Sequence, residues 1–519
     1  MRTWITLVIC ILLLFRPIWT SRAVEPEPPA SILIQHGILI DGTGSGRRQA
    51  DVRIFGDSIQ DVGHLKPLPG EKVVDATGFV VAPGFIDTLS HADSGILEDP
   101  LAETQIRQGI TTAVVGHDGA SNSPLKDWFT QVEKKHVALN FASFAGHGTV
   151  RHTAMGRDFK RHSTPAELEV MCKLIEQDMQ SGALGLSSGL EYDPGYYSDT
   201  DELISCSKVA AKYGGMYVSH VRDEGDRVFD AFRELIRIAE AAHIPANISH
   251  IKLATSPAWN RAEEVQHLLA NARKRGLDIT ADVYPYTYWQ SSITVLITSR
   301  DWDDRRAWAK GLTEVGGPTH VLLGSYMPDT SWAGKTVAQI AEATHRDPIS
   351  VVQEIVQKTQ GRQDGDQDSE NVVVTAMTDN DVRTFVCDPH IMFCSDGSMD
   401  DTHPRGAGTF PRVLAHYVRD MHALTLEQAV HKMTGLSAQR MGFVDRGRVA
   451  PGMKADITIF NPWTVLDTAT TEHPRSAPVG IPDVLVNGKM VLENGKFTGA
   501  KPGMVLRHAR TVTVGLAKR

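Results

Sequence analysis

This 519-residue chain has few cysteines, few long hydrophobic runs and no excess of positive charge. Its five cysteines form no C-x-x-C pair, which argues against a zinc ribbon or a dithiol redox motif. Its 53 Lys and Arg face 62 acidic residues, and the formal net charge of −9 argues against nucleic acid or an anionic membrane as the main partner. A 41% share of hydrophobic residues and a 22% share of charged ones are typical of a globular protein.

The N-terminus has the pattern of a secretory signal peptide. Arg2 precedes an apolar run from Trp4 to Phe15, and Ala23 ends a small-residue cleavage site. The run is shorter than a bilayer-spanning helix needs, although an uncleaved anchor is the alternative. We expect residues 1–23 to be removed on export, residues 24–30 to form a linker, and the mature protein to be periplasmic or secreted without stable membrane association. The spacing of Cys387 and Cys394 does not decide whether the two form a disulfide in such an exported protein.

The middle of the chain, about residues 83–440, alternates strand-like and helix-like segments, as proteins with a parallel sheet do. The candidate strands are residues 85–90, 111–116, 138–145, 183–188, 216–220, 245–250, 278–283 and 391–395. Eight such strands are what a closed parallel barrel needs, so the sequence predicts an α/β fold built on a TIM-like (β/α)8 barrel. Residues 289–371 are too long for one connection and predict an insertion over the site.

Short β segments flank this middle part on both sides. Residues 31–82 and 441–507 hold short apolar runs separated by turn residues, among them Asn487-Gly488, a signal for a type I′ hairpin. We expect the two ends of the chain to build one small β-sandwich domain beside the barrel.

Metal-capable side chains follow the ends of several predicted strands. They are His91 after the first strand, His117 and Asp118 after the second, His147 after the third, His220 and His250 at the ends of the fifth and sixth, and Asp396 after the eighth. In a parallel barrel these ends share one rim, which carries the catalytic groups. Imidazole and carboxylate together suit Zn²⁺ with an open position for water, whose pKa then falls to ~7. Each histidine alone could be an ordinary hydrogen-bonded polar residue, so the prediction of a metal site rests on the whole set.

Asp396 and a group of donors are candidates for catalysis and substrate binding. A carboxylate beside an activated water can accept its proton and return it to a leaving amine, although Asp396 could also be a hydrogen-bonded turn residue. Arg222 and Lys252 lie two residues past strand-end histidines, and Arg405 follows on a later loop. These cations could hold a substrate carboxylate or be paired surface charges. Tyr284 could donate to a developing oxyanion or pack at the rim.

A long ordered set of segments resembles the amidohydrolase superfamily and, within it, the N-acyl-D-amino-acid deacylases (D-aminoacylases). The segments are APGFID (82–87), QGITTAVVG (108–116), GALGLSSGLEYDPG (182–195), YGGMYVSHVRDEGDR (213–227), ISHIK (248–252), DVYPYT (282–287), CSDG (394–397) and GTFPRVLAHYVR (408–419). The resemblance covers about residues 31 to 507. It implies a metal-bearing barrel with a terminal β-sandwich that hydrolyses N-acyl-D-amino acids to a carboxylate and a free D-amino acid.

The resemblance also implies roles for single residues. His220 and His250 match zinc ligands of the family, and Asp396 matches its catalytic acid/base. The residues that match substrate-holding positions are Arg222, Lys252, Tyr284 and Arg405. The implied partner is a small acylated amino acid, with the oligomeric state left open.

Two positions depart from the family pattern. The family usually has His-x-His after the first strand, whereas this chain has Leu89-Ser90-His91. A cysteine that completes the tight metal site in D-aminoacylases of the Gly-Asn-Cys-Gly type is replaced by Asp118, and carboxylate oxygen is an acceptable zinc ligand at ~2.0–2.2 Å. We expect one tightly bound zinc held by Asp118, His220 and His250, with His91 a weak or absent contributor to a second site.

Other functions are compatible with the same resemblance. A cyclic-amide hydrolase and a D-dipeptidase of the same superfamily are rivals within this chemistry. A catalytically inactive binding protein that keeps the fold is a rival of another class, because Leu89 removes a ligand.

Overall fold

The computed structural model describes residues 31–360 and 369–508. The predicted signal peptide and linker, residues 1–30, lie outside the described residues. None of the helices in the described ranges is long and apolar enough to cross a membrane.

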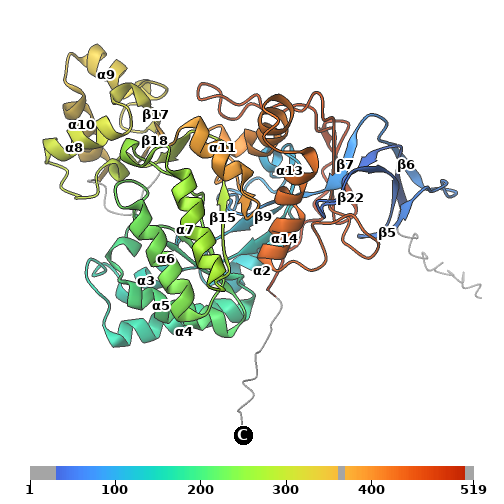
Figure 1. The fold of residues 1–519 in the computed structure, drawn as a ribbon, viewed down its shortest axis with the longest axis horizontal. Coiled ribbons are helices and arrows are strands. Elements are labelled where there is room, and N and C mark those ends of the chain that lie inside the picture. Colours follow the sequence, from blue (N-terminus) through green and yellow to red (C-terminus); the bar gives the residue numbers. More distant parts are fainter. Residues whose placement is uncertain (1–30, 361–368, 509–519) are drawn as a thin grey trace, which may run out of the picture.

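A closed barrel of parallel strands occupies the middle of the chain, with helices around it (Figure 1). Its strands are β8 (Phe85–Asp87), β9 (Ile110–Val115), β10 (Asn140–Ser143) continued by β11 (Ala145–Gly146), β12 (Gly185–Gly189), β13 (Met216–His220), β14 (Ala246–Ile248), β15 (Ile279–Val283) and β19 (Ile391–Phe393). Each pairs in parallel with its neighbour. Every segment predicted as a strand overlaps one of them, so the predicted barrel is confirmed.

The first and last strands complete the ring through hydrogen bonds. The backbone N–H of Asp396 donates to the carbonyl of Leu89 at 2.9 Å. The Thr88 hydroxyl donates to the carbonyl of Phe393 at 3.1 Å. These bonds bring the loops after β8 and β19 side by side, although about 300 residues of chain separate them.

Alternate residues of the barrel strands enter two different apolar clusters. Val114 and Val218 pack with Met392 in one cluster, whereas Val115 and Tyr217 belong to the large core that includes the surrounding helices. Side chains of a strand point alternately to its two faces, and both faces of this sheet are covered. This explains why the strands read as continuous apolar runs in the sequence.

Helices surround the barrel. They are α2 (Leu125–Lys135), α3 (His147–Met155), α4 (Pro165–Ser181), α5 (Thr200–Lys212), α6 (Val228–Ala242), α7 (Ala262–Lys274), α11 (Asp379–Cys387), α12 (Arg405–Arg412), α13 (Leu426–Met433) and α14 (Gly435–Met441). Four of those described begin with a side-chain cap, namely α4, α5, α11 and α13. At the start of α4, Thr164 and Glu167 form a capping box, which satisfies two N–H groups that the helix itself cannot pair. The helix ends at Gly182, whose φ of 108° lies in the left-handed region that glycine adopts most easily.

Two sheets beside the barrel combine both ends of the chain. The first has the order β5-β4-β1-β6 and the second the order β23-β22-β21-β20-β7-β2-β3. Their strands are β1 (Ser31–Gln35), β2 (Ile38–Leu39), β3 (Arg48–Gln49), β4 (Asp51–Phe55), β5 (Ser58–Gly63), β6 (Lys72–Asp75), β7 (Val80–Pro83), β20 (Ile457–Phe460), β21 (Asp483–Val486), β22 (Lys489–Glu493) and β23 (Lys496–Phe497). Ile34 and Val52 of one sheet pack with Val81 and Ile457 of the other in a shared apolar cluster. Because β20 pairs antiparallel with β7, N- and C-terminal strands share one sheet.

The long segment between β15 and β19 forms a separate lobe at the upper left of Figure 1. Its antiparallel sheet has the order β16-β18-β17. The elements of the lobe are β16 (Tyr288–Ser291), β17 (Val321–Tyr326), β18 (Glu370–Thr375), α8 (Arg305–Glu314), α9 (Val337–Thr344) and α10 (Pro348–Gln360). Asn371 in β18 accepts a hydrogen bond of 2.6 Å from Thr402 on the loop after β19, which fixes the lobe beside the rim. All four cysteines within the described ranges are free, with Cys394 buried and Cys387 exposed.

A buried acid in this lobe predicts a pH-dependent stability. Glu370 accepts hydrogen bonds from Ser292 Oγ at 2.6 Å and Ile293 N at 3.1 Å. Burial raises its pKa from 4.5 to about 7. Between these values the folded chain keeps a proton that the unfolded chain has released, so this group's contribution to the free energy of unfolding falls as pH rises through that window.

We expect the substitution Glu370→Gln to remove this pH-dependent loss of unfolding free energy, which amounts to at most about 3 kcal/mol. Glutamine keeps the acceptor oxygen and has no proton to lose. Urea unfolding of both proteins at pH 5 and pH 7.5 measures the difference. An equal fall in stability between the two pH values in wild type and variant would contradict the assignment.

Candidate metal centre and active site

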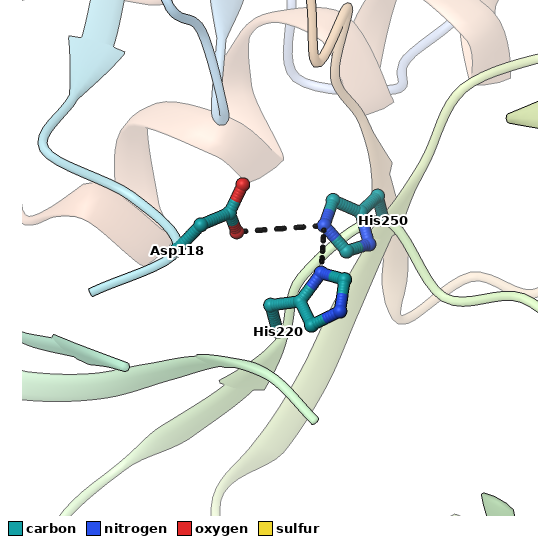
Figure 2. A group of neighbouring side chains, drawn as sticks. All are labelled: Asp118, His220 and His250. Atoms are coloured by element: carbon teal, nitrogen blue, oxygen red, sulfur yellow. Dashed lines mark hydrogen bonds and ion pairs between the residues drawn. The ribbon is translucent and has the colours of Figure 1, made fainter. Parts of the chain in front are cut away.

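Three ligand-type side chains converge at the C-terminal ends of the barrel strands. His220 ends β13, His250 follows β14, and Asp118 follows β9 (Figure 2). His220 Nδ1 lies 3.0 Å from His250 Nε2, and His250 Nε2 lies 3.4 Å from Asp118 Oδ1. Asp118 Oδ1 is buried, and no described residue donates a hydrogen bond to it. A carboxylate oxygen without a donor, facing two imidazoles, fits a bound cation with nitrogen and oxygen ligands.

The backbone at these strand ends is unusual. Asp118 has a φ of 55°, His250 of 34° and Asp396 of 51°, all in the left-handed region that non-glycine residues rarely adopt. Such conformations cost free energy and cluster at functional sites. Here the chain turns sharply just after the strand in each case, which directs the side chain into the centre of the rim.

His91 and Asp396 form a second group next to the first. His91 Nε2 lies 3.3 Å from Asp118 Oδ2 and 3.2 Å from Asp396 Oδ1. The two oxygens of Asp118 therefore face different histidines. Leu89 takes no part in this group, because its buried side chain packs with Tyr284 in a small apolar cluster.

The charges of the centre are unbalanced without a cation. Burial disfavours the charged imidazoles of His91 and His250, but the carboxylates of Asp118 and Asp396 outweigh it. The pKa of His91 is raised, and that of His250 is raised to about 10. Although burial acts in the opposite direction, His250 and His91 lower the pKa of Asp118, and Arg405 lowers that of Asp396. Both acids thus stay ionised, and a divalent cation would supply the positive charge that protons otherwise supply.

Two glutamates that sequence reasoning missed lie behind the imidazoles. Glu191 Oε2 is 3.2 Å from His220 Nε2, and Glu224 Oε1 is 3.3 Å from His250 Nδ1. The backbone N–H of Glu224 donates to Glu191 Oε1 at 2.8 Å, which ties the two glutamates together. A carboxylate behind a ligating imidazole fixes the tautomer and the ring orientation. Glu191 follows β12, the one barrel strand to which the sequence assigned no polar group.

The donors predicted to hold the substrate lie on one side of the centre. Arg405 forms an ion pair with Asp396, and Lys252 Nζ donates to Glu224 at 2.9 Å. The ring centroid of Tyr284 lies 5.1 Å from the Arg405 guanidinium and 5.6 Å from Lys252 Nζ. The Tyr284 hydroxyl is buried without a hydrogen-bond partner among the described residues, whereas Arg405 Nε lies 3.6 Å from Asp401 Oδ2. An orphaned hydroxyl donor between two cationic side chains fits an anionic ligand.

Arg222 contacts other groups than these donors do, so its substrate-binding role stays a prediction. Its Nε and Nη2 form a bidentate ion pair with Glu234 of α6 at 2.8 and 3.0 Å, and Nη1 donates to the carbonyl of Tyr196. The side chain thus joins a helix to a loop. His147 is also engaged elsewhere, at 2.8 Å from the buried Glu202. Burial lowers the pKa of His117 to about 3, so this ring is neutral at pH 7.

Comparison with known proteins identifies the family. The chain belongs to the amidohydrolase family, whose model matches residues 72–492. It is 34% identical over 508 residues to the D-aminoacylase of Alcaligenes xylosoxydans xylosoxydans, covering 93% of this chain and 98% of that protein. The predicted resemblance is therefore confirmed.

Solved structures agree with this placement. The N-acyl-D-glutamate deacylase of Bordetella bronchiseptica, complexed with zinc and a phosphonate mimic of the tetrahedral intermediate, superposes with a TM-score of 0.83 at 32% identity, covering 93% of this chain and 100% of that one. A D-aminoacylase described as having a binuclear metal centre, with one-metal activation and second-metal attenuation, gives a TM-score of 0.82 at 33% identity, covering 92% and 100%.

The glutamate behind His220 can be tested by metal affinity. We expect Glu191→Gln to weaken zinc binding by about 10- to 100-fold, because the amide no longer holds the His220 tautomer as firmly. Competition with a chelating dye measures the affinity. Glu169→Gln, which changes an exposed glutamate on α4, is the matched control. Equal zinc affinity in the two variants would show that Glu191 does not position the ligand.

Proposed function

We propose that this protein is a zinc-dependent deacylase that hydrolyses the amide bond of N-acyl-D-amino acids to a carboxylate and a free D-amino acid. The observation that carries the proposal is the convergence of Asp118, His220 and His250 beside Asp396. It occurs in a chain that aligns along 93% of its length with a D-aminoacylase.

Asp118, His220 and His250 would hold the zinc ion, which when bound would polarise the amide carbonyl and lower the pKa of water. Asp396 is placed to move the proton. Its Oδ1 faces His91, and its Oδ2 is paired with Arg405, so the carboxylate is ionised and fixed in orientation. Asp396 accepts the proton of the attacking water and passes it to the amide nitrogen as the C–N bond breaks.

The α-carboxylate of the substrate binds at Arg405, Lys252 and Tyr284. The Tyr284 hydroxyl has no hydrogen-bond partner among the described residues and is free to donate to it. Lys252 adds a buried positive charge nearby, since its pKa is raised by Glu224 despite burial. A carboxylate fixed at this point places the adjoining amide over the metal ligands.

The number of zinc ions that the chain binds follows from Leu89, which stands where the family usually has a histidine. The tight site is Asp118, His220 and His250. The second group, His91, Asp118 and Asp396, shares Asp118 with the first and lacks any ligand from Leu89. We propose that it binds a second zinc weakly or not at all.

The role of Asp396 gives the first test of this function. We expect Asp396→Ala to lower kcat on an N-acetyl-D-amino acid by about 100-fold or more, because the proton carrier is gone. Zinc content, measured by mass spectrometry, should stay that of wild type. Asp400→Ala, at an exposed acid on the same loop, is the control. Near-normal turnover of Asp396→Ala would refute the role, and equal hydrolysis of L- and D-enantiomers would refute the substrate class.

The role of position 89 gives the second test. We expect wild type and Leu89→Met to retain one zinc per chain after loading with excess zinc and dialysis against zinc-free buffer, and Leu89→His to retain two. Methionine keeps the volume of leucine, whereas histidine restores a ligand. Elemental analysis reads the stoichiometry directly. Two tightly held zinc ions in wild type would contradict the proposal.

A further inference from the structure

Two cysteines lie side by side where helices α4 and α5 pack together. Cys172 is on α4 and Cys206 is on α5. Cys206 is fully buried in the main apolar cluster, and the half-buried Cys172 packs against that cluster. Neither thiol belongs to the metal centre or to the group of substrate donors, so the function proposed above leaves this pair unexplained.

Hydrogen bonds on either side of the pair set the relative position of the two helices. Near their N-terminal ends, Ser163 Oγ donates to Glu202 Oε2 at 2.6 Å. Near their C-terminal ends, the Tyr213 hydroxyl donates to Glu176 Oε1 at 2.9 Å. The two cysteines lie between these contacts along both helices, and a hydrogen bond joins their side chains. A disulfide needs Cα atoms about 4.4–6.8 Å apart, a separation that facing residues of packed helices reach.

The two thiols differ in reactivity. The hydrogen bond from Cys206 lowers the pKa of Cys172 to about 7, whereas the same bond and burial raise the pKa of Cys206. A thiolate is the attacking species in disulfide exchange, and a thiol whose pKa lies near the ambient pH attacks best. Cys172 is also the partly exposed member of the pair. It is therefore placed to react first, with Cys206 directly behind it.

We propose that Cys172 and Cys206 form a disulfide that links α4 to α5, with a low-molecular-weight disulfide such as oxidised glutathione as the oxidant. The Cys172 thiolate attacks one sulfur of the oxidant, which breaks its S–S bond and releases one thiolate. Cys206 Sγ then attacks Cys172 Sγ and displaces the second thiolate. The two protein thiols give their protons to the released thiolates, so they are oxidised as one disulfide of the oxidant is reduced.

The new bond would close a loop of the chain around β12. This loop contains Glu191, the glutamate behind His220. A cross-link of this kind stabilises the folded protein mainly by restricting the unfolded chain. The export that the N-terminal sequence predicts would bring the pair into an oxidising compartment, where disulfides persist. The inference does not depend on the proposed function.

Peptide mapping of the purified protein tests the proposal. Reduced protein is incubated with oxidised glutathione, its remaining thiols are alkylated, and it is then digested with trypsin. Cleavage after Arg161, Lys173 and Lys208 puts the two cysteines on separate peptides. We expect mass spectrometry to recover these two peptides joined by a disulfide. The Tm of the oxidised protein should exceed that of the reduced protein by about 2–5 °C.

Three variants serve as controls. Cys387→Ser changes an exposed cysteine and should keep both the joined peptides and the shift in Tm. Cys172→Ser should lose both, and Cys206→Ala should stop at the mixed disulfide between Cys172 and glutathione. If either of these two variants does not fold, the wild-type peptide map alone decides. A wild-type Cys172 that stays unmodified, stays bound to glutathione or pairs with Cys387 would overturn the proposal.

Discussion

The structure depends on a surplus of negative charge held at one end of a closed barrel. Asp118, Asp396, Glu191 and Glu224 lie within one group of contacts at the rim, and within it Lys252 and Arg405 supply the permanent positive charges. Carboxylates withdrawn from water are costly unless a cation compensates them. The carboxylates raise the pKa values of His91 and His250, and a metal ion would replace the protons that these imidazoles hold.

Closure of the barrel brings the reacting groups together. The loop after β8 contributes His91 and the loop after β19 contributes Asp396, and the two strands are neighbours only because the ring closes between them. The N–H of His91 donates to the carbonyl of Gly397, and the Ser395 N–H donates to the buried Asp87 at 2.7 Å. Loosening this seam would separate the base from the metal ligands. Catalysis and the integrity of the barrel therefore rest on the same contacts.

Sequence patterns predicted those site residues whose positions are set by the ends of strands. Buried parallel strands are continuous apolar runs, so their ends could be located, and His220, His250 and Asp396 stand at those ends. Strand alternation could not place the Arg222 side chain, because β13 stops at His220 and alternation does not decide where a side chain points beyond that residue. Glu234, the partner of Arg222, lies on the next helix, and no spacing rule predicts that pairing. Glu191 was missed because it lies two residues beyond the end of β12, in a turn whose path only the structure gives.

The central claim of the proposed function is that one zinc ion is held by two imidazoles and the carboxylate of Asp118. X-ray absorption at the zinc edge of the purified, zinc-loaded protein tests this claim most directly. The account predicts a first shell of nitrogen and oxygen only, at ~2.0–2.2 Å, with the multiple scattering of two imidazoles. A sulfur shell at ~2.3 Å, or a spectrum without imidazole scattering, would contradict it.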